Sequence, residues 1–227
     1  VHQPLLAAIS AAALPKMSEF QPVSLAKLAW AYAKLEIQDV PLLEALSDAA
    51  IVRIGDFNQQ NMANTAWAYA KLVVEDIPLL EAIAKHAICH ISDFIPQGLS
   101  NTVWAFAKIG FADAPFLDPI APGVLRSIGE FAPQNLSNTS WAFAALGILH
   151  RPMLEAISAQ AEQKLRQLAP RDMSNLAWAF AKLSVDDRPL LDALAGEAVK
   201  RIFEFDPQGL TNMSWSCATL AFKQIRA

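Results

Sequence analysis

Residues 96–109 read PQGLSNTVWAFAKI, and this stretch decides the fold because it recurs along the whole chain. Related copies stand at 133–146 (PQNLSNTSWAFAAL), 170–183 (PRDMSNLAWAFAKL) and 207–220 (PQGLTNMSWSCATL). The six tryptophans are each separated by 37 residues: Trp30, Trp67, Trp104, Trp141, Trp178 and Trp215. A set of prolines keeps the same period: Pro4, Pro41, Pro78, Pro115, Pro152 and Pro189. A constant period of this length indicates a repeat architecture.

Each repeat predicts two helices. The first is expected over residues 96–109 in the third copy, with Pro96 at the first helical position, where a missing N–H costs nothing. The second is expected over residues 78–92 in the second copy, where Leu80, Ile83 and Ala87 follow a helical period. Neither helix can bury its apolar side alone, so neighbouring pairs must stack to form a continuous core.

The predicted fold class is therefore all-α, an α-solenoid of stacked antiparallel helix pairs in which we expect a right-handed superhelix. The expected domain is a single solenoid over 1–227, starting with the second helix of a preceding repeat at 1–19. Full repeats are then expected at 20–56, 57–93, 94–130, 131–167 and 168–204, and a partial one at 205–227. Because the ends lack polar capping repeats, we expect the chain to be part of a longer protein or to have its ends covered by partners.

Two places depart from the regular pattern. Pro15 lies inside the first expected helix and should kink or end it there. Pro119, Pro122 and Gly123 interrupt the second helix of the 94–130 repeat, where we expect a broken or displaced helix.

Composition narrows the class of protein. Hydrophobic residues make up 54% and charged residues 18%, which excludes a disordered chain. No apolar run is long enough to cross a bilayer, so no membrane span is expected. Two cysteines are too few for a disulfide framework and fit a reducing compartment. The net charge of −4 gives no global attraction to nucleic acid, so any electrostatic argument depends on where the charges lie.

The repeated PQxLSNxxWAFAKL and PLLxAI segments resemble the heptatricopeptide family, and they are similar to octotricopeptide repeats and to the repeat regions of FAST-kinase-like and RAP-domain proteins. The resemblance covers the whole chain, although no RAP domain is recognisable. It implies an α-solenoid that binds single-stranded RNA and acts in organellar RNA metabolism or translation, in a mitochondrion or chloroplast.

A candidate ligand surface follows from the position of the tryptophan in each first helix. At 100° per residue, the residues seven before, three before and four after it fall in a narrow arc beside it. Seven before stand Gln60, Gln97, Gln134, Arg171 and Gln208; three before stand Lys27, Asn64, Asn101, Asn138, Asn175 and Asn212; four after stand Lys34, Lys71, Lys108 and Lys182. These residues are the predicted RNA-binding set.

The distribution of charge along the chain also favours a ligand on this surface. The six first helices contain six basic residues and one acidic residue, Asp172, so they carry +5 and leave −9 on the rest of the chain. A lysine in most repeats, beside an asparagine, suits a phosphate backbone, since repeat proteins that bind RNA read about one base per repeat.

Structural alternatives remain open for each row. The asparagines suit hydrogen bonds to the backbone of a neighbouring repeat as well as bonds to bases. The lysines are equally compatible with solvated side chains that cover the indole rings. We expect the six tryptophans to form a structural repeat core, with base stacking as the alternative. The residue six before tryptophan varies among Ser24, Asn61, Gly98, Asn135, Asp172 and Gly209, which suits either a base-reading position or an unconstrained surface.

The sequence predicts no catalytic residues, no cofactor and no metal site, and so no enzyme. His86, Cys89 and His90 lie within one helical turn but lack a fourth ligand. His150 occupies a connection, where contact with a phosphate is conceivable.

The sequence therefore supports two functions. The first is a helical-repeat module for single-stranded RNA. The second is a scaffold subunit of a large organellar assembly that contacts protein subunits.

Overall fold

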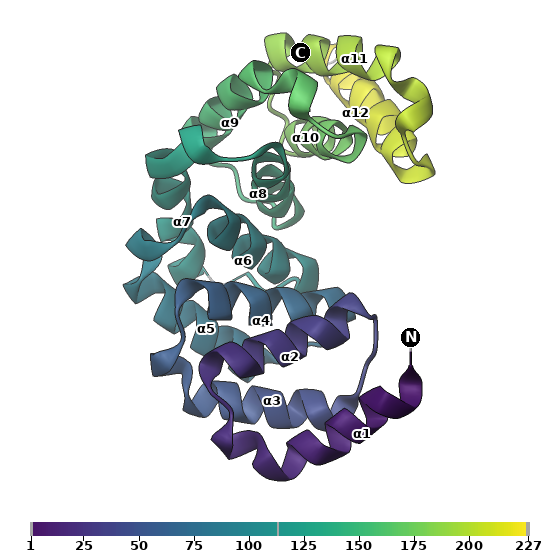
Figure 1. The fold of residues 1–227 in the computed structure, drawn as a ribbon. Coiled ribbons are helices and arrows are strands. Elements are labelled where there is room, and N and C mark those ends of the chain that lie inside the picture. The colour runs from purple at the N-terminus through teal and green to yellow at the C-terminus, as the bar shows by residue number, and fades with distance from the viewer. Residues whose placement is uncertain (1, 113, 226–227) are drawn as a thin grey trace. The chain divides into compact units, whose positions relative to one another are not determined.

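The computed structural model describes residues 2–112 and 114–225, and the side chains of these except for residues 114 and 221–225. Within this part the chain forms twelve α-helices and no strands (Figure 1). It divides into two compact units, Val1–Pro119 and Ile120–Ala227, which are described separately. No helix of the described residues is long and apolar enough to cross a membrane.

The helices alternate between first and second members of the predicted pairs. The first helices are α2 (Pro22–Lys34), α4 (Gln59–Leu72), α6 (Pro96–Ile109), α8 (Pro133–Ala145), α10 (Pro170–Lys182) and α12 (Pro207–Ile225). The second helices are α1 (Gln3–Ala13), α3 (Val40–Val52), α5 (Ile77–Cys89), α7 (Ala114–Ser127), α9 (Arg151–Gln163) and α11 (Arg188–Lys200). The predicted first helix at 96–109 is confirmed, and the predicted second helix at 78–92 is observed as α5.

Short 3₁₀ turns follow the second helices and lead into the next pair: η1 (Leu14–Glu19), η2 (Ile54–Asp56), η3 (Ile91–Asp93), η4 (Ile128–Glu130), η5 (Leu165–Gln167) and η6 (Ile202–Glu204). The expected effect of Pro15 is confirmed, because α1 ends at Ala13 and Pro15 lies in η1.

For the 94–130 repeat we expected a broken or displaced helix: the break is wrong, because α7 is a continuous helix from Ala114 to Ser127, and the displacement stays a prediction. Pro119 and Pro122 each remove one backbone donor, yet Phe116, Ile120 and Val124 on the same face are fully buried. The burial of this apolar stripe offsets the two missing hydrogen bonds.

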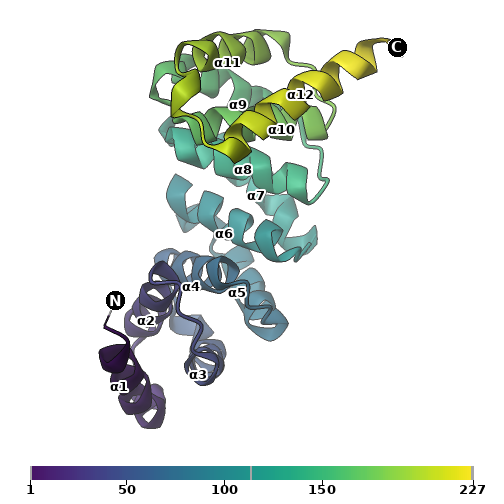
Figure 2. The same cartoon turned by 90° about the vertical axis from the view of Figure 1, so that its right-hand side faces the viewer.

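Stacking within each unit follows the solenoid pattern. In the first unit α4 packs against both α2 and α6, and α3 packs against α5; in the second unit α10 packs against both α8 and α12, and α9 packs against α11. Figures 1 and 2 both show these first helices side by side within each unit. The α-solenoid predicted from the repeat is confirmed.

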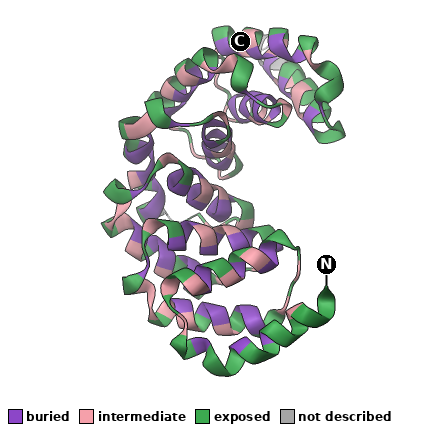
Figure 3. Cartoon of the chain, viewed as in Figure 1, coloured by how far each residue is buried: buried purple, intermediate pink, exposed green. Residues whose placement is uncertain are grey.

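In five of the six first helices, the residue two after the tryptophan is an aromatic side chain of the core. Tyr32, Tyr69, Phe106, Phe143 and Phe180 are all at most 1% exposed. Figure 3 shows the buried residues concentrated on the faces that the stacked helices turn towards each other. The Tyr32 hydroxyl donates to the Leu6 carbonyl (2.7 Å) and the Tyr69 hydroxyl to the Leu43 carbonyl (2.5 Å), each 26 residues earlier. Burial of these hydroxyls raises the pKa of both tyrosines, so they stay protonated donors.

In three repeats, a basic side chain donates a hydrogen bond to the linker that precedes the repeat. Arg53 donates to the Phe20 carbonyl (2.6 Å), Lys164 to the Phe131 carbonyl (2.6 Å) and Arg201 to the Leu168 carbonyl (2.7 Å). These three residues occupy one repeat position at the C-terminal end of a second helix. They therefore satisfy linker carbonyls that would otherwise be left without a partner near the core.

Candidate nucleic-acid interface on the first helices

The candidate surface is the part of each first helix that the stack leaves accessible. In the described residues, the positions one before and five before the tryptophan are buried in every repeat up to α10, as is the position two after. The accessible positions are the tryptophan itself and the three predicted rows, which span an arc of about 60° on an ideal helix. We call this arc the tryptophan face.

Every residue of the predicted RNA-binding set is accessible. The lysines, the glutamines and Arg171 are exposed, and the five asparagines are partly exposed. The only acid in the six first helices, Asp172, is buried. The tryptophan face therefore presents basic and neutral polar groups without an accessible carboxylate of its own helices.

The tryptophans correct the expectation that they form the repeat core. Trp30 is 42% exposed and Trp215 is 41% exposed, and the other four rings are only partly buried. The periodicity identified their face, but the aromatic residue two positions later lies on the side where helices stack and fills the interior instead. The rings form a ladder: Trp141 and Trp178 lie 6.3 Å apart at 29°, and Trp178 and Trp215 lie 6.3 Å apart at 36°.

The lysines differ in their surroundings. The Lys34 ammonium lies 5.7 Å from the Trp30 ring and 5.8 Å from the Trp67 ring, close enough for a cation–π contact with both. Lys71 pairs with Glu36 at 2.8 Å, and this hydrogen bond lowers the pKa of Glu36. Lys108 and Lys182 form no ion pair within the described residues.

The asparagine row does not bond the neighbouring backbone, which was its structural alternative. Within the described part of the chain, no side-chain hydrogen bond involves Asn64, Asn101, Asn138, Asn175 or Asn212. Their amides therefore face solvent on the tryptophan face, where a ligand can reach them.

In three of the six repeats, the side chain at the variable position six before tryptophan has a structural role. Asn61, Asn135 and Asp172 are buried at the third position of their helices, where each accepts a hydrogen bond from the backbone N–H before the helix (3.2, 3.0 and 3.1 Å). Asp172 also accepts from Ser137 of the preceding repeat at 2.7 Å. The variation among these three repeats reflects different side chains that satisfy the same backbone N–H.

In the repeat that contains Gly98, the backbone N–H before the helix is capped by a side chain of the preceding repeat. The Ile95 N–H donates to Gln59 Oε1 of the preceding repeat at 2.9 Å, and a Cβ on Gly98 would lie 2.9 Å from that oxygen and 3.1 Å from the Phe94 ring. Gln59 thus occupies the space of the side chain that Gly98 lacks.

We predict that Gln59→Ala lowers the free energy of unfolding by ~1 kcal/mol, because the cap of α6 is lost. Adding Gly98→Asn should restore it by supplying the amide within α6, as Asn61 does in α4, once the Phe94 ring shifts by a few tenths of an ångström. Urea denaturation of the wild type, both single variants and the double variant measures this. A double variant no more stable than Gln59→Ala contradicts the capping role.

The other polar candidates have structural partners. His86 contacts the Phe57 carbonyl at 3.1 Å and His90 the His86 carbonyl at 3.0 Å, with their rings 4.4 Å apart. No cluster of three or more metal-ligating side chains occurs in the described residues. His150, conceivable as a phosphate contact, is the N-cap of α9 and accepts from the Met153 N–H at 3.1 Å.

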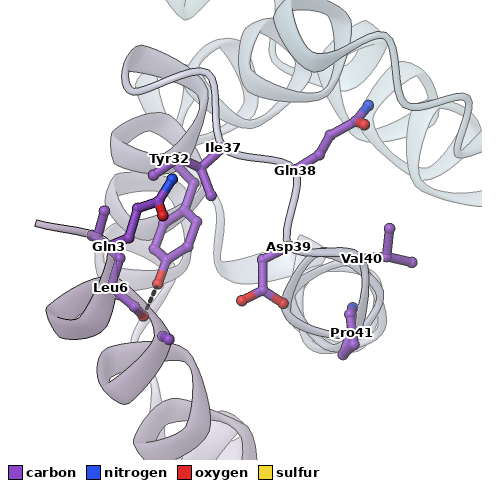
Figure 4. A pocket seen from close by; sticks show the side chains of 9 residues that line it. Gln3, Leu6, Tyr32, Ile37, Gln38, Asp39, Val40 and Pro41 are labelled. Carbon is purple, nitrogen blue, oxygen red and sulfur yellow. Dashed lines mark hydrogen bonds between the residues drawn. The ribbon is translucent and has the colours of Figure 1, made fainter. Parts of the chain in front are cut away.

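Two hollows in the first unit differ in what lines them. One of about 520 Å³ lies between α1, α2 and the connection to α3 (Figure 4). There the Tyr32 hydroxyl reaches Leu6, the Asp39 carboxylate caps α3 through the Leu42 N–H, and Gln38 turns away to donate to the Leu72 carbonyl. Its side-chain donors and acceptors are largely committed to the fold. The other, of about 130 Å³, lies between α4 and α6 on the tryptophan face.

A comparison of the chain with known protein families found a matching family model. No curated protein matches the chain significantly. The family model described as RNA-editing substrate-binding complex 6 protein matches residues 2–126 and, in an overlapping alignment, residues 48–188. Overlapping alignments are expected of a repeat, which fits one model in more than one register. This match supports a helical-repeat family connected with RNA, without singling out heptatricopeptide or octotricopeptide repeats. Since the two alignments together cover most of its length, the chain belongs to the RNA-editing substrate-binding complex 6 protein family.

Proposed function

We propose that this chain is a non-enzymatic module that binds single-stranded RNA along the tryptophan face, within an RNA-editing substrate-binding complex. The observation that carries the proposal is the accessible ladder of indole rings flanked by lysines and unpaired carboxamides. Proteins that bind single strands combine aromatic stacking surfaces with a positively charged track for the backbone. The family description supports the setting. An organellar location is part of the proposal, and cell fractionation tests it.

A titration of the purified chain with a fluorescent single-stranded RNA at several salt concentrations tests the proposal. We expect affinity tighter than the ~10⁻⁴–10⁻⁶ M of non-specific contacts and a steep fall with salt. Absence of binding at low salt would overturn it.

Lys108→Glu with Lys182→Glu should weaken RNA binding about 10-fold, because two phosphate contacts are lost. Each lost contact should also reduce the slope of log affinity against log salt by ~0.7. The slope of log affinity against log salt, from fluorescence anisotropy, checks this. Lys85→Glu with Lys200→Glu makes the same charge change on exposed second-helix positions and is the matched control. Equal losses in both pairs would reduce the effect to net charge and contradict a specific track.

A protein scaffold is the second candidate, favoured by a different surface. Val52 and Val199 are 84% and 73% exposed near second-helix ends, and Phe203 in η6 is fully exposed. Exposed apolar side chains of this size suit protein contacts. Co-purification with an assembly that survives ribonuclease, and is lost on Phe203→Asp, would support this candidate.

A further inference from the structure

The hollow between α4 and α6 is lined mainly by carboxamides. Gln60 and Asn64 come from α4, and Gln97 and Asn101 come from α6. Gly98 also lines it, at the position that Asn61, Asn135 and Asp172 fill in other repeats. Gln59 fills the space beside Gly98, so the hollow itself is bounded by the four carboxamides.

The four carboxamides have donors and acceptors to offer. None of them makes a side-chain hydrogen bond in the described residues, whereas the neighbouring Gln59 is committed to the Ile95 N–H. Each primary amide presents N–H donors beside a carbonyl acceptor, which pairs with a ligand edge carrying the complementary pattern.

The hollow lies on the same helix faces as two of the indole rings. Asn64 is three residues before Trp67, and Asn101 three before Trp104, so each amide shares a helix face with an indole at ~4.5 Å along the axis. A base stacked on either ring therefore has an edge within reach of these amides.

We propose that this hollow, hereafter the amide pocket, recognises the edge of one adenine in the bound strand. Asparagine and glutamine pair with adenine in a bidentate manner, donating to a ring nitrogen and accepting from the exocyclic amine. The amide pocket rests on the proposed RNA function and adds base selectivity to it.

The test compares three fluorescent octamers, UUUUUUUU, UUUCUUUU and UUUAUUUU. The wild-type chain binds the adenine-containing strand about 10-fold more tightly, the lower part of the range for one bidentate pair. Asn64→Leu with Asn101→Leu abolishes that preference and leaves the salt slope unchanged, because phosphate contacts remain. Gln160→Leu with Gln163→Leu removes two carboxamides from α9 and is the matched control.

A second variant guards against misfolding of the first. Gln60→Leu with Gln97→Leu removes the other two carboxamides of the amide pocket, both of them exposed, and it also abolishes the adenine preference. Equal wild-type affinity for the three octamers, or a preference retained in both variants, overturns the amide pocket while RNA binding stands. If none of the octamers binds at low salt, the proposed function itself fails.

Discussion

Replacing Trp141 and Trp178 together by alanine should weaken single-stranded RNA binding by roughly 10²-fold or more. Base stacking on an aromatic side chain is worth ~1–3 kcal/mol per base, and these two rings face each other across 6.3 Å on the accessible face. The repeat of Trp141 carries Ala145 four residues after the ring, where Lys34 follows Trp30, so its own helix offers no lysine at that position. Fluorescence anisotropy at fixed salt measures the loss.

Phe203→Ala is the matched control, because it removes a fully exposed aromatic ring away from the tryptophan face. Its RNA affinity should equal that of the wild type. The tryptophan variant must also unfold cooperatively, which thermal denaturation monitors. A folded double variant with wild-type affinity would show that the indoles do not stack on bases, and the scaffold candidate would then be preferred.

Phe180→Ala should lower the free energy of unfolding by ~3–5 kcal/mol, the usual cost of emptying a buried phenylalanine site. The Phe180 ring is completely buried in α10, two residues after the partly exposed Trp178. Chemical denaturation followed by circular dichroism measures the change. Trp178→Ala should cost less, since part of that ring is already in water.

Phe180→Tyr provides the conservative comparison. Tyr69 occupies the equivalent position in α4 and donates to a carbonyl 26 residues earlier. A tyrosine at 180 should find the corresponding carbonyl of Leu154 and retain wild-type stability. Strong destabilisation by Phe180→Tyr would show that the two repeats pack this position differently, even though their sequences align.

The helix pairs were predictable because proline and the 3.6-residue period act locally. Pro96 and the apolar residues behind it determine α6 without reference to the rest of the chain. The same local reasoning failed at Pro119 and Pro122, where burial of Phe116, Ile120 and Val124 holds α7 together. Such burial depends on neighbouring repeats and has no local signal.

The candidate site was predictable as a face and less so in its details. Periodicity grouped the tryptophans with lysines and amides, but it could not tell whether the stack would cover the indole or leave it accessible. The capping role of Asn61, Asn135 and Asp172 depends on linker geometry. An asparagine three residues after a helix start is itself a capping signal, and it would have identified Asn61. The amide pocket depends on carboxamides of α4 and α6 that come together only when two repeats are stacked.

The ammonium of Lys34 lies near both Trp30 and Trp67, so this pair of rings already holds an internal competitor. A base entering there must displace a cation, whereas Trp141 and Trp178 face each other and the row position that Lys34 fills is Ala145 in the Trp141 repeat. Affinity would then be graded from repeat to repeat. Under the RNA proposal, a strand would first bind at Trp141 and Trp178 and then extend to the other repeats. The order in which the repeats bind would therefore depend on one position, where Ala145 replaces a lysine.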